Sequence, residues 1–257
     1  MSKVIEENTL TGIADAIREK TGSTDKLKPS EMANAIKKIE TGSQEDTLIS
    51  LMTDTITKVS SDKPTSIGGS LFQNCTSIRE ALFPNVSAVW DYAFDGATNL
   101  EKVVVSDKVS IIRNATFRNC KNLSSFKIPP SVTSIADNSF INCNSLPVTE
   151  LPPVLKTIGG YAFQNCYKLA VKKFPSSLTS IGNAGIRYCN GMTKIFLPST
   201  LTGIATGNFT YCNGLTDIYT PHENRPSGWN SSAISPAVTV HYGVTEEEFD
   251  EILKAGE

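Results

Sequence analysis

Apolar and small residues recur along most of the chain at a nearly constant interval. The six cysteines are separated by 45, 23, 23, 23 and 23 residues, and 45 equals 22 plus 23 with Ala97 in the place of a cysteine. A large apolar residue lies three positions before each member of this series, and another lies three positions after it. The members are Cys75, Ala97, Cys120, Cys143, Cys166, Cys189 and Cys212, and the preceding apolar residues are Phe72, Phe94, Phe117, Phe140, Phe163, Ile186 and Phe209. Self-similarity with this period predicts a solenoid of stacked repeats that share one core.

Each repeat ends in a segment with the pattern L-x-x-I-x-L-P, for example the segment that ends at Pro129. Alternating apolar residues predict a short strand, and the proline stops it. The full consensus, I-G-x-x-A-F-x-x-C-x-x-L-x-x-I-x-L-P, resembles the BspA-like class of bacterial leucine-rich repeats from roughly Thr47 to Tyr242. That resemblance implies an α/β repeat solenoid that is curved and right-handed, with short parallel strands on its concave side. We assign seven repeats to residues 67–221, with Ala97, Ile186 and Lys172 as departures from the consensus.

Residues 1–42 break the repeat and predict a small helical hairpin, because apolar residues there follow a helical spacing. This hairpin is either a cap on the solenoid or a docking module. The segments Thr11–Gly22 and Leu27–Ile36 are similar to N-terminal modules of tail-associated proteins from phages and prophages of Firmicutes. The resemblance implies that residues 1–42 attach the chain to other tail or structural proteins.

The segments flanking the repeats are interpreted as adaptors and caps. Residues 43–66 form a linker and an irregular first coil, and residues 222–257 form a C-terminal cap. In that cap we expect Trp229 to plug the core and a strand to end at Tyr242. The string Thr245–Glu248 matches a capping box and predicts a short acidic helix that protects the open end of the core.

Composition limits the classes of partner. A net charge of -2 gives no reason to expect nucleic acid. No apolar run reaches the roughly 18 residues of a membrane-spanning helix, and the N-terminus shows no signal-peptide pattern. We expect the chain to act either in a virion, as part of a phage tail, or outside the cell or on its surface. We do not expect it to insert into a membrane.

The cysteines allow three interpretations. A metal or thiol site needs closely spaced ligands or a histidine partner, but the cysteines lie at least 23 residues apart and both His222 and His241 follow the last one. We therefore favour a ladder of inert packing residues over disulfides and over a metal site. The sequence carries no enzyme motif of the common hydrolase, nucleotide-binding or metalloprotease types. We expect a protein without cofactor, metal or catalytic activity.

A binding surface is expected at the outward positions of the predicted strands. These positions vary between repeats whereas the inward positions do not. One outward column reads Leu82, Val104, Lys127, Glu150, Lys173, Phe196 and Tyr219, and its neighbour reads Glu80, Lys102, Ser125, Val148, Val171, Lys194 and Asp217. Exposed aromatic side chains beside cations suit recognition of a protein or a glycan. The candidate ligand-binding residues are Lys127, Glu150, Lys173, Lys194, Phe196, Asp217 and Tyr219, and the alternative is an ordinary strand surface without a ligand.

These observations favour a non-enzymatic binding protein. The leading hypothesis is a phage or prophage tail-associated module that binds a protein or glycan on a host surface. A bacterial cell-surface or secreted adhesin is the first alternative, and a structural spacer without ligand is the second. The sequence specifies no oligomeric state.

Overall fold

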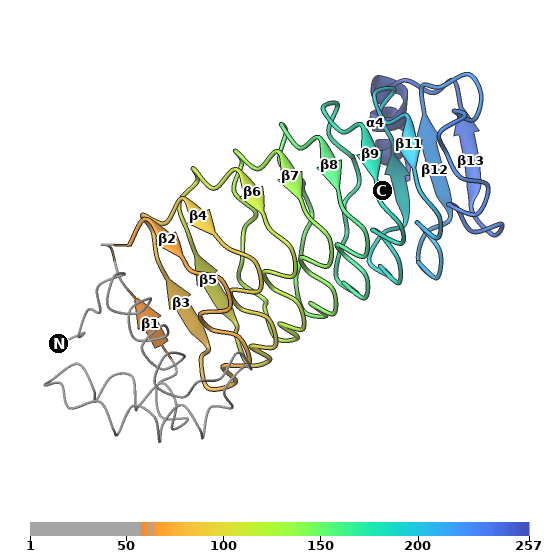
Figure 1. The fold of residues 1–257 in the computed structure, drawn as a ribbon. Coiled ribbons are helices and arrows are strands. Elements are labelled where there is room, and N and C mark those ends of the chain that lie inside the picture. Colours follow the sequence, from red (N-terminus) through yellow and green to blue (C-terminus); the bar gives the residue numbers. More distant parts are fainter. Residues whose placement is uncertain (1–57, 61, 63, 257) are drawn as a thin grey trace, which may run out of the picture.

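The coils stack side by side into one elongated array. In this computed structural model the described residues are 58–60, 62 and 64–256, and they form a solenoid of parallel strands with about eight turns. Figure 1 shows the array running from β1 near the N-terminal end to β13 at the other end. The predicted hairpin of residues 1–42 and most of the linker lie outside the described residues.

Two strips of strands run along the array. The first contains the longer strands, and all of its pairings are parallel. Isolated bridges from Lys102 to Ser125 and from Lys173 to Phe196 extend it into the middle coils. Its strands are β1 (Lys58–Ser60), β3 (Glu80–Leu82), β5 (Lys102–Val104), β10 (Lys194–Phe196), β12 (Asp217–Thr220) and β13 (Thr239–Tyr242). The outward side of this strip, together with residues 125–127, 148–150 and 171–173 of the middle coils, is called the long-strand face below.

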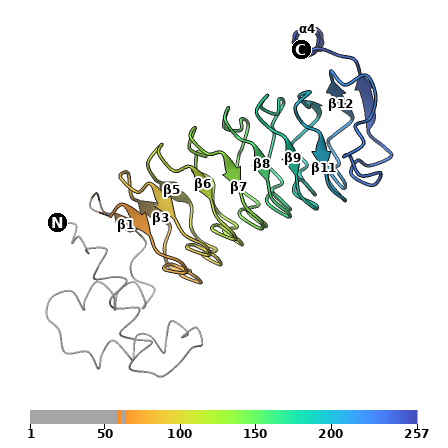
Figure 2. The same ribbon diagram turned by 45° about the horizontal axis from the view of Figure 1, so that its top comes forward.

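The second strip was not predicted. It consists of two-residue strands, mostly a small polar residue followed by a buried isoleucine, and it lies on another side of each coil (Figure 2). Isoleucine and valine favour extended backbone, and parallel stacking pairs each strand with the next coil. Its members are β2 (Ser66–Ile67), β4 (Ala88–Val89), β6 (Ile111–Ile112), β7 (Ser134–Ile135), β8 (Thr157–Ile158), β9 (Ser180–Ile181) and β11 (Gly203–Ile204).

The predicted inward and outward positions change places in two middle coils. Val148 and Val171 were expected to face outward, but both are buried, at 5% and 1% exposure. The next residues, Thr149 and Lys172, are exposed in their place. Residues 148–150 and 171–173 form no named strand, so strict alternation does not hold there, and Glu150 stays exposed beside Thr149. A polar residue at the inward position therefore moved the neighbouring valine into the core.

The core is built from columns of identical residues, as the period predicted. The rings of Phe72, Phe94, Phe117, Phe140 and Phe163 are nearly parallel, and successive centroids lie 5.1–5.5 Å apart. Because nearly every coil contributes an apolar side chain of the same kind at the same height, the apolar core is continuous along the array.

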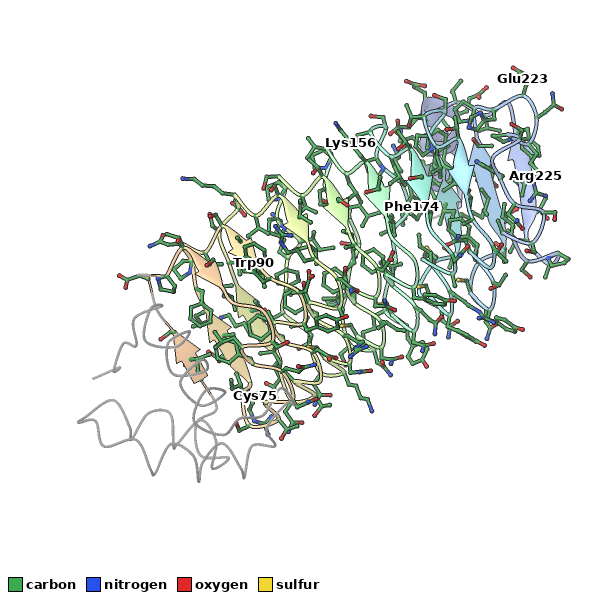
Figure 3. All side chains as sticks on the ribbon, viewed as in Figure 1. Cys75, Trp90, Lys156, Phe174, Glu223 and Arg225 are labelled. Carbon is green, nitrogen blue, oxygen red and sulfur yellow. The ribbon has the colours of Figure 1, made fainter. Side chains whose placement is uncertain are left out.

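The cysteine ladder is a packing feature, and Cys120, Cys143, Cys166, Cys189 and Cys212 are buried free thiols. The thiol of Cys143 donates a hydrogen bond to the carbonyl of Phe117 at 3.0 Å, and Cys120, Cys166 and Cys189 make the equivalent bond at 3.1 Å. Burial raises the pKa of these four thiols, which keeps them protonated. Figure 3 shows Cys75 at one rim of the coils and Lys156 at the opposite rim.

An asparagine ladder accompanies the cysteines. Asn119, Asn142 and Asn165 each precede a cysteine and have left-handed backbone, with φ between 62° and 63°. The amide of Asn142 donates to Asn119 and that of Asn165 donates to Asn142, each at 2.7 Å. Asparagine tolerates this conformation better than other non-glycine residues. The same residue thus forms the tight turn and joins neighbouring coils.

The C-terminal segment forms a last coil and then a helix. Trp229 is buried, as expected, and its indole N–H donates to the carbonyl of Leu201 at 2.9 Å. Strand β13 pairs with β12 and ends at Tyr242. Helix α4 (Glu246–Ala255) begins with the predicted capping box between Thr245 and Glu248. It is the only helix among the described residues, and the arcs between the two strips are turns.

Candidate binding surface

Helix α4 covers one end of the long-strand face, which corrects an expectation from the sequence. The helix was predicted to protect the open end of the core. Figure 2 shows it to one side of the last coils, and Phe249 packs against the rings of Phe196 and Tyr219 with centroid distances of 5.7 and 5.2 Å. These three residues form a small apolar cluster separate from the main core.

The two aromatic residues proposed as exposed ligand contacts are therefore buried. Phe196 is 3% exposed and Tyr219 is 7% exposed. They are adjacent, as predicted, because β10 and β12 pair in parallel with Phe196 opposite Tyr219. Burying apolar rings under an amphipathic helix is more favourable than leaving them in water, so the chain covers its own aromatic patch.

Lys173 joins the same column and holds the helix. Its ammonium group donates to Asp250 at 2.7 Å and to Glu246 at 3.1 Å. Partial burial opposes the positive charge, but the hydrogen bonds to the two carboxylates outweigh it and raise the pKa of Lys173. The side chain of Lys173 is 33% exposed, so each ion pair contributes only about 0–1 kcal/mol.

Asp217 pairs with the last strand. His241 on β13 lies within 2.8 Å of the Asp217 carboxylate through Nε2, and its ring stacks on Tyr219 at 4.4 Å. The hydrogen bond from His241, with a second from the hydroxyl of Thr216, lowers the pKa of Asp217. Lys194 lies in the same register row as Asp217. The contacts of His241 with Asp217 and Tyr219 join β13 to β12.

The middle of the long-strand face remains open. Lys102, Ser125, Lys127 and Glu150 are all exposed. Of the seven sequence-predicted residues, Lys127 and Glu150 lie on the open part and Lys173, Phe196 and Tyr219 lie beneath α4. The remaining two, Lys194 and Asp217, are paired in register on β10 and β12. Charged side chains of both signs on an extended strand surface can contact polar groups of a large ligand.

A second surface feature was not predicted. Trp90 follows β4 and is 46% exposed, and the guanidinium of Arg113 lies 4.4 Å from its ring centroid. Near the cysteine rim, Arg187 lies 5.0 and 4.9 Å from the rings of Tyr188 and Tyr211. Trp90 and Arg113 are 23 residues apart, so the repeat interval itself would have placed them side by side.

Within residues 58–60, 62 and 64–256, no group of three or more His, Cys, Asp or Glu side chains is placed to hold a metal ion. The same part of the chain contains no helix that is long and apolar enough to cross a membrane.

The repeat region matches a known protein family. The family model described as the BspA type leucine rich repeat region matches residues 50–170 and 137–233, in six copies. No curated protein matches the sequence.

Several solved structures are similar to this chain. A leucine-rich repeat protein of T. pallidum is 21% identical over 78% of this chain and 84% of its own, with a TM-score of 0.45. The pneumococcal vaccine antigen PcpA is 14% identical over 78% of this chain but only 39% of its own, with a TM-score of 0.41. A leucine rich cell surface protein of Faecalibacterium prausnitzii is 18% identical over 76% of this chain and 81% of its own, with a TM-score of 0.28.

Proposed function

This chain belongs to the family with BspA-type leucine-rich repeats, and we propose that it is a non-enzymatic protein that binds a cell-surface protein or glycan. The observation that carries the proposal is that the inward residue columns stay constant from coil to coil whereas the outward columns vary. The inward columns repeat Phe, Cys and Leu from coil to coil, whereas the outward positions of the open face differ in size and charge. A scaffold that keeps its core while varying one face is suited to recognition, since side chains there do not contribute to folding.

The proposed contact region is the open part of the long-strand face. Lys102 and Lys127 offer cations, Glu150 offers an anion, and Ser125 offers a hydroxyl on neighbouring coils. Lys102 lies in β5 and Ser125 is bridged to it in parallel, so the backbone that carries these groups is fixed and little backbone entropy is lost on binding. A ligand that bears both hydrogen-bond donors and charged or polar acceptors matches this surface.

Charge reversal tests the surface. We expect the double variant Lys102→Glu and Lys127→Glu to lose binding to whole cells or to an arrayed glycan by about tenfold or more. The matched control is Lys121→Glu with Lys168→Glu, which reverses two exposed lysines just after the cysteines of their repeats. Equal binding by both double variants and the wild type would remove the open face as the contact region.

The site of action is a second proposal, based on the N-terminal sequence. Residues 1–42 resemble modules of tail-associated proteins, and we propose that they attach the chain to a phage tail with the repeats directed outward. A cell-surface or secreted adhesin remains the alternative. Deleting residues 1–42 should prevent incorporation into particles while leaving the thermal unfolding of the repeats intact. Particles that incorporate the shortened chain at the wild-type level would contradict the attachment role.

A further inference from the structure

Helix α4 contacts the long-strand face in the way that a docked peptide contacts its receptor. Phe249 is the only fully buried residue of the helix, and it lies against Phe196 and Tyr219. Val244, Ile252 and Leu253 pack only partly against the same cluster. The cluster is separate from the core that holds the coils together. The helix can therefore leave the face without opening the coils.

Helix α4 has its own N-terminal capping residues, and a short connection joins it to β13. The capping box at Thr245 and the acidic first turn stabilise it independently of the face. It follows β13 through Gly243, whose φ of 71° is one that glycine adopts readily, and Val244. The backbone N–H groups of Gly243 and Val244 bond to the carbonyls of His222 and Thr220, so the movement of α4 begins after Val244 or breaks these two bonds.

The uncovered surface would be specific in its chemistry. It presents two adjacent aromatic rings and the ammonium group of Lys173, which now binds Glu246 and Asp250. On α4 these two acids lie one turn apart, with Phe249 directly before the second. The complementary ligand is an amphipathic helix with the pattern acid-x-x-Phe-acid.

We propose that this end of the long-strand face is a docking site for an acidic amphipathic helix of a partner protein, and that α4 occupies it as an internal competitor. The inference does not depend on binding at the open face, because it concerns different residues. An attached competitor acts at a high effective concentration. The partner helix therefore binds weakly until α4 is loosened.

A labelled peptide and full-length variants test the competition. The probe is a fluorescein-labelled peptide with the sequence of residues 244–257, and fluorescence anisotropy reports its binding. We expect the Phe249→Ala chain to bind the probe at least about tenfold more tightly than the wild type does. Adding Lys173→Glu to that chain should abolish the gain. A probe that itself carries alanine in place of its phenylalanine should bind neither chain.

Two further variants keep the result interpretable. Glu246→Lys with Asp250→Lys opens the helix by repulsion from Lys173 and leaves Phe249 in place, so it should also bind the probe more tightly. Lys254→Ala, which changes the exposed end of α4, should behave like the wild type. The proposal is wrong if no opened chain binds the probe, or if Lys173→Glu leaves the affinity unchanged. If the wild type forms a dimer and Phe249→Ala dissociates it, the occupant of the site is the helix of a second copy of this chain. That result would overturn the assignment to a different partner protein.

Discussion

At the scale of single residues, stability depends on side chains that repeat at the same height in every coil. Phe140 lies between Phe117 and Phe163, with ring centroids 5.3 Å away on both sides. Offset parallel rings add a favourable contact to the burial of apolar area. Ile186 replaces phenylalanine in this column, and Phe163 therefore has a ring neighbour from this column on one side only.

Truncating the central ring should be costly. We expect Phe140→Ala to lower the free energy of unfolding by about 3–5 kcal/mol, because the fully buried ring leaves a cavity between two coils. Urea denaturation followed by circular dichroism measures the change. Tyr167→Ala is the control, since this ring is 43% exposed and its loss should cost less than about 0.5 kcal/mol. Equal losses for the two variants would contradict the stacking argument.

The cysteines should divide into two classes of reactivity. Cys75 is only half-buried, and the pKa of Cys212 is lowered by its hydrogen bond with the Cys189 side chain. Cys120, Cys143, Cys166 and Cys189 are instead buried with pKa values raised by burial. A thiol reagent should therefore label Cys75 first and the four inner thiols only when the chain unfolds, because the reactive thiolate is suppressed. Release of the coloured thiolate from a disulfide reagent reports the rates. Fast labelling of more than two thiols in the native protein would argue against a sealed ladder.

At the scale of elements, the long-strand face is held together at its end by contacts between β12, β13 and α4. Burial of Phe249 is worth about 1.5–3 kcal/mol, and the ion pairs of Lys173 add less. An isolated helix of this length is marginal in water, so α4 depends on the face that it covers. The burial of Phe249 is therefore the main contribution that holds α4 on the face.

The pairing of Asp217 with His241 should make the stability of this end depend on pH. The pKa of Asp217 is lowered in the folded chain, chiefly by the hydrogen bond from His241. Its contribution is therefore fully present above the unfolded value of about 3.9 and is lost as the pH falls through the lower folded value. We expect the wild type to be more stable than Asp217→Asn at about pH 5, and this difference to shrink as the pH falls below the unfolded value and through the lower folded value.

Urea titrations of both chains across that range measure the difference. Asp107→Asn, which changes an exposed carboxylate outside β12 and β13, is the matched control. A difference between wild type and Asp217→Asn that stays constant with pH would show that the carboxylate acts only by packing.

At the scale of the whole molecule, the solenoid behaves as a one-dimensional stack. Each coil contacts mainly its two neighbours, so the stability is a sum of similar terms along the array. The two proposed binding sites lie on the long-strand face, and the proposed attachment is made by residues 1–42. The core residues of the coils take part in neither and serve as the scaffold.

Removing one complete repeat should leave a folded protein. Deletion of residues 144–166 joins Cys143 to Tyr167 and keeps every column in register. We expect cooperative urea unfolding with a denaturant dependence lower by roughly one-tenth, in proportion to the surface lost. Deletion of residues 144–155 removes half a repeat and should prevent folding, because core and surface positions no longer align. A folded half-repeat deletion would contradict the role of the register.

The sequence by itself determined the repeat period, the core columns, the inert cysteines and the capping box of α4. This was possible because stacking turns a fixed interval along the chain into a contact between neighbouring coils, as in the Asn119, Asn142 and Asn165 ladder. The register of the outward columns was also correct at Phe196 and Tyr219, but their exposure was not.

Only the tertiary structure decided which surfaces stay open. Helix α4 returns to Lys173 across 73 and 77 residues, separations that are not multiples of the repeat and leave no periodic signal. Val148 and Val171 turned inward because the core selects the apolar side chain of each adjacent pair. The free energy of the assembled coils decides where a segment packs back on the array. It also decides which of two adjacent side chains takes one core position.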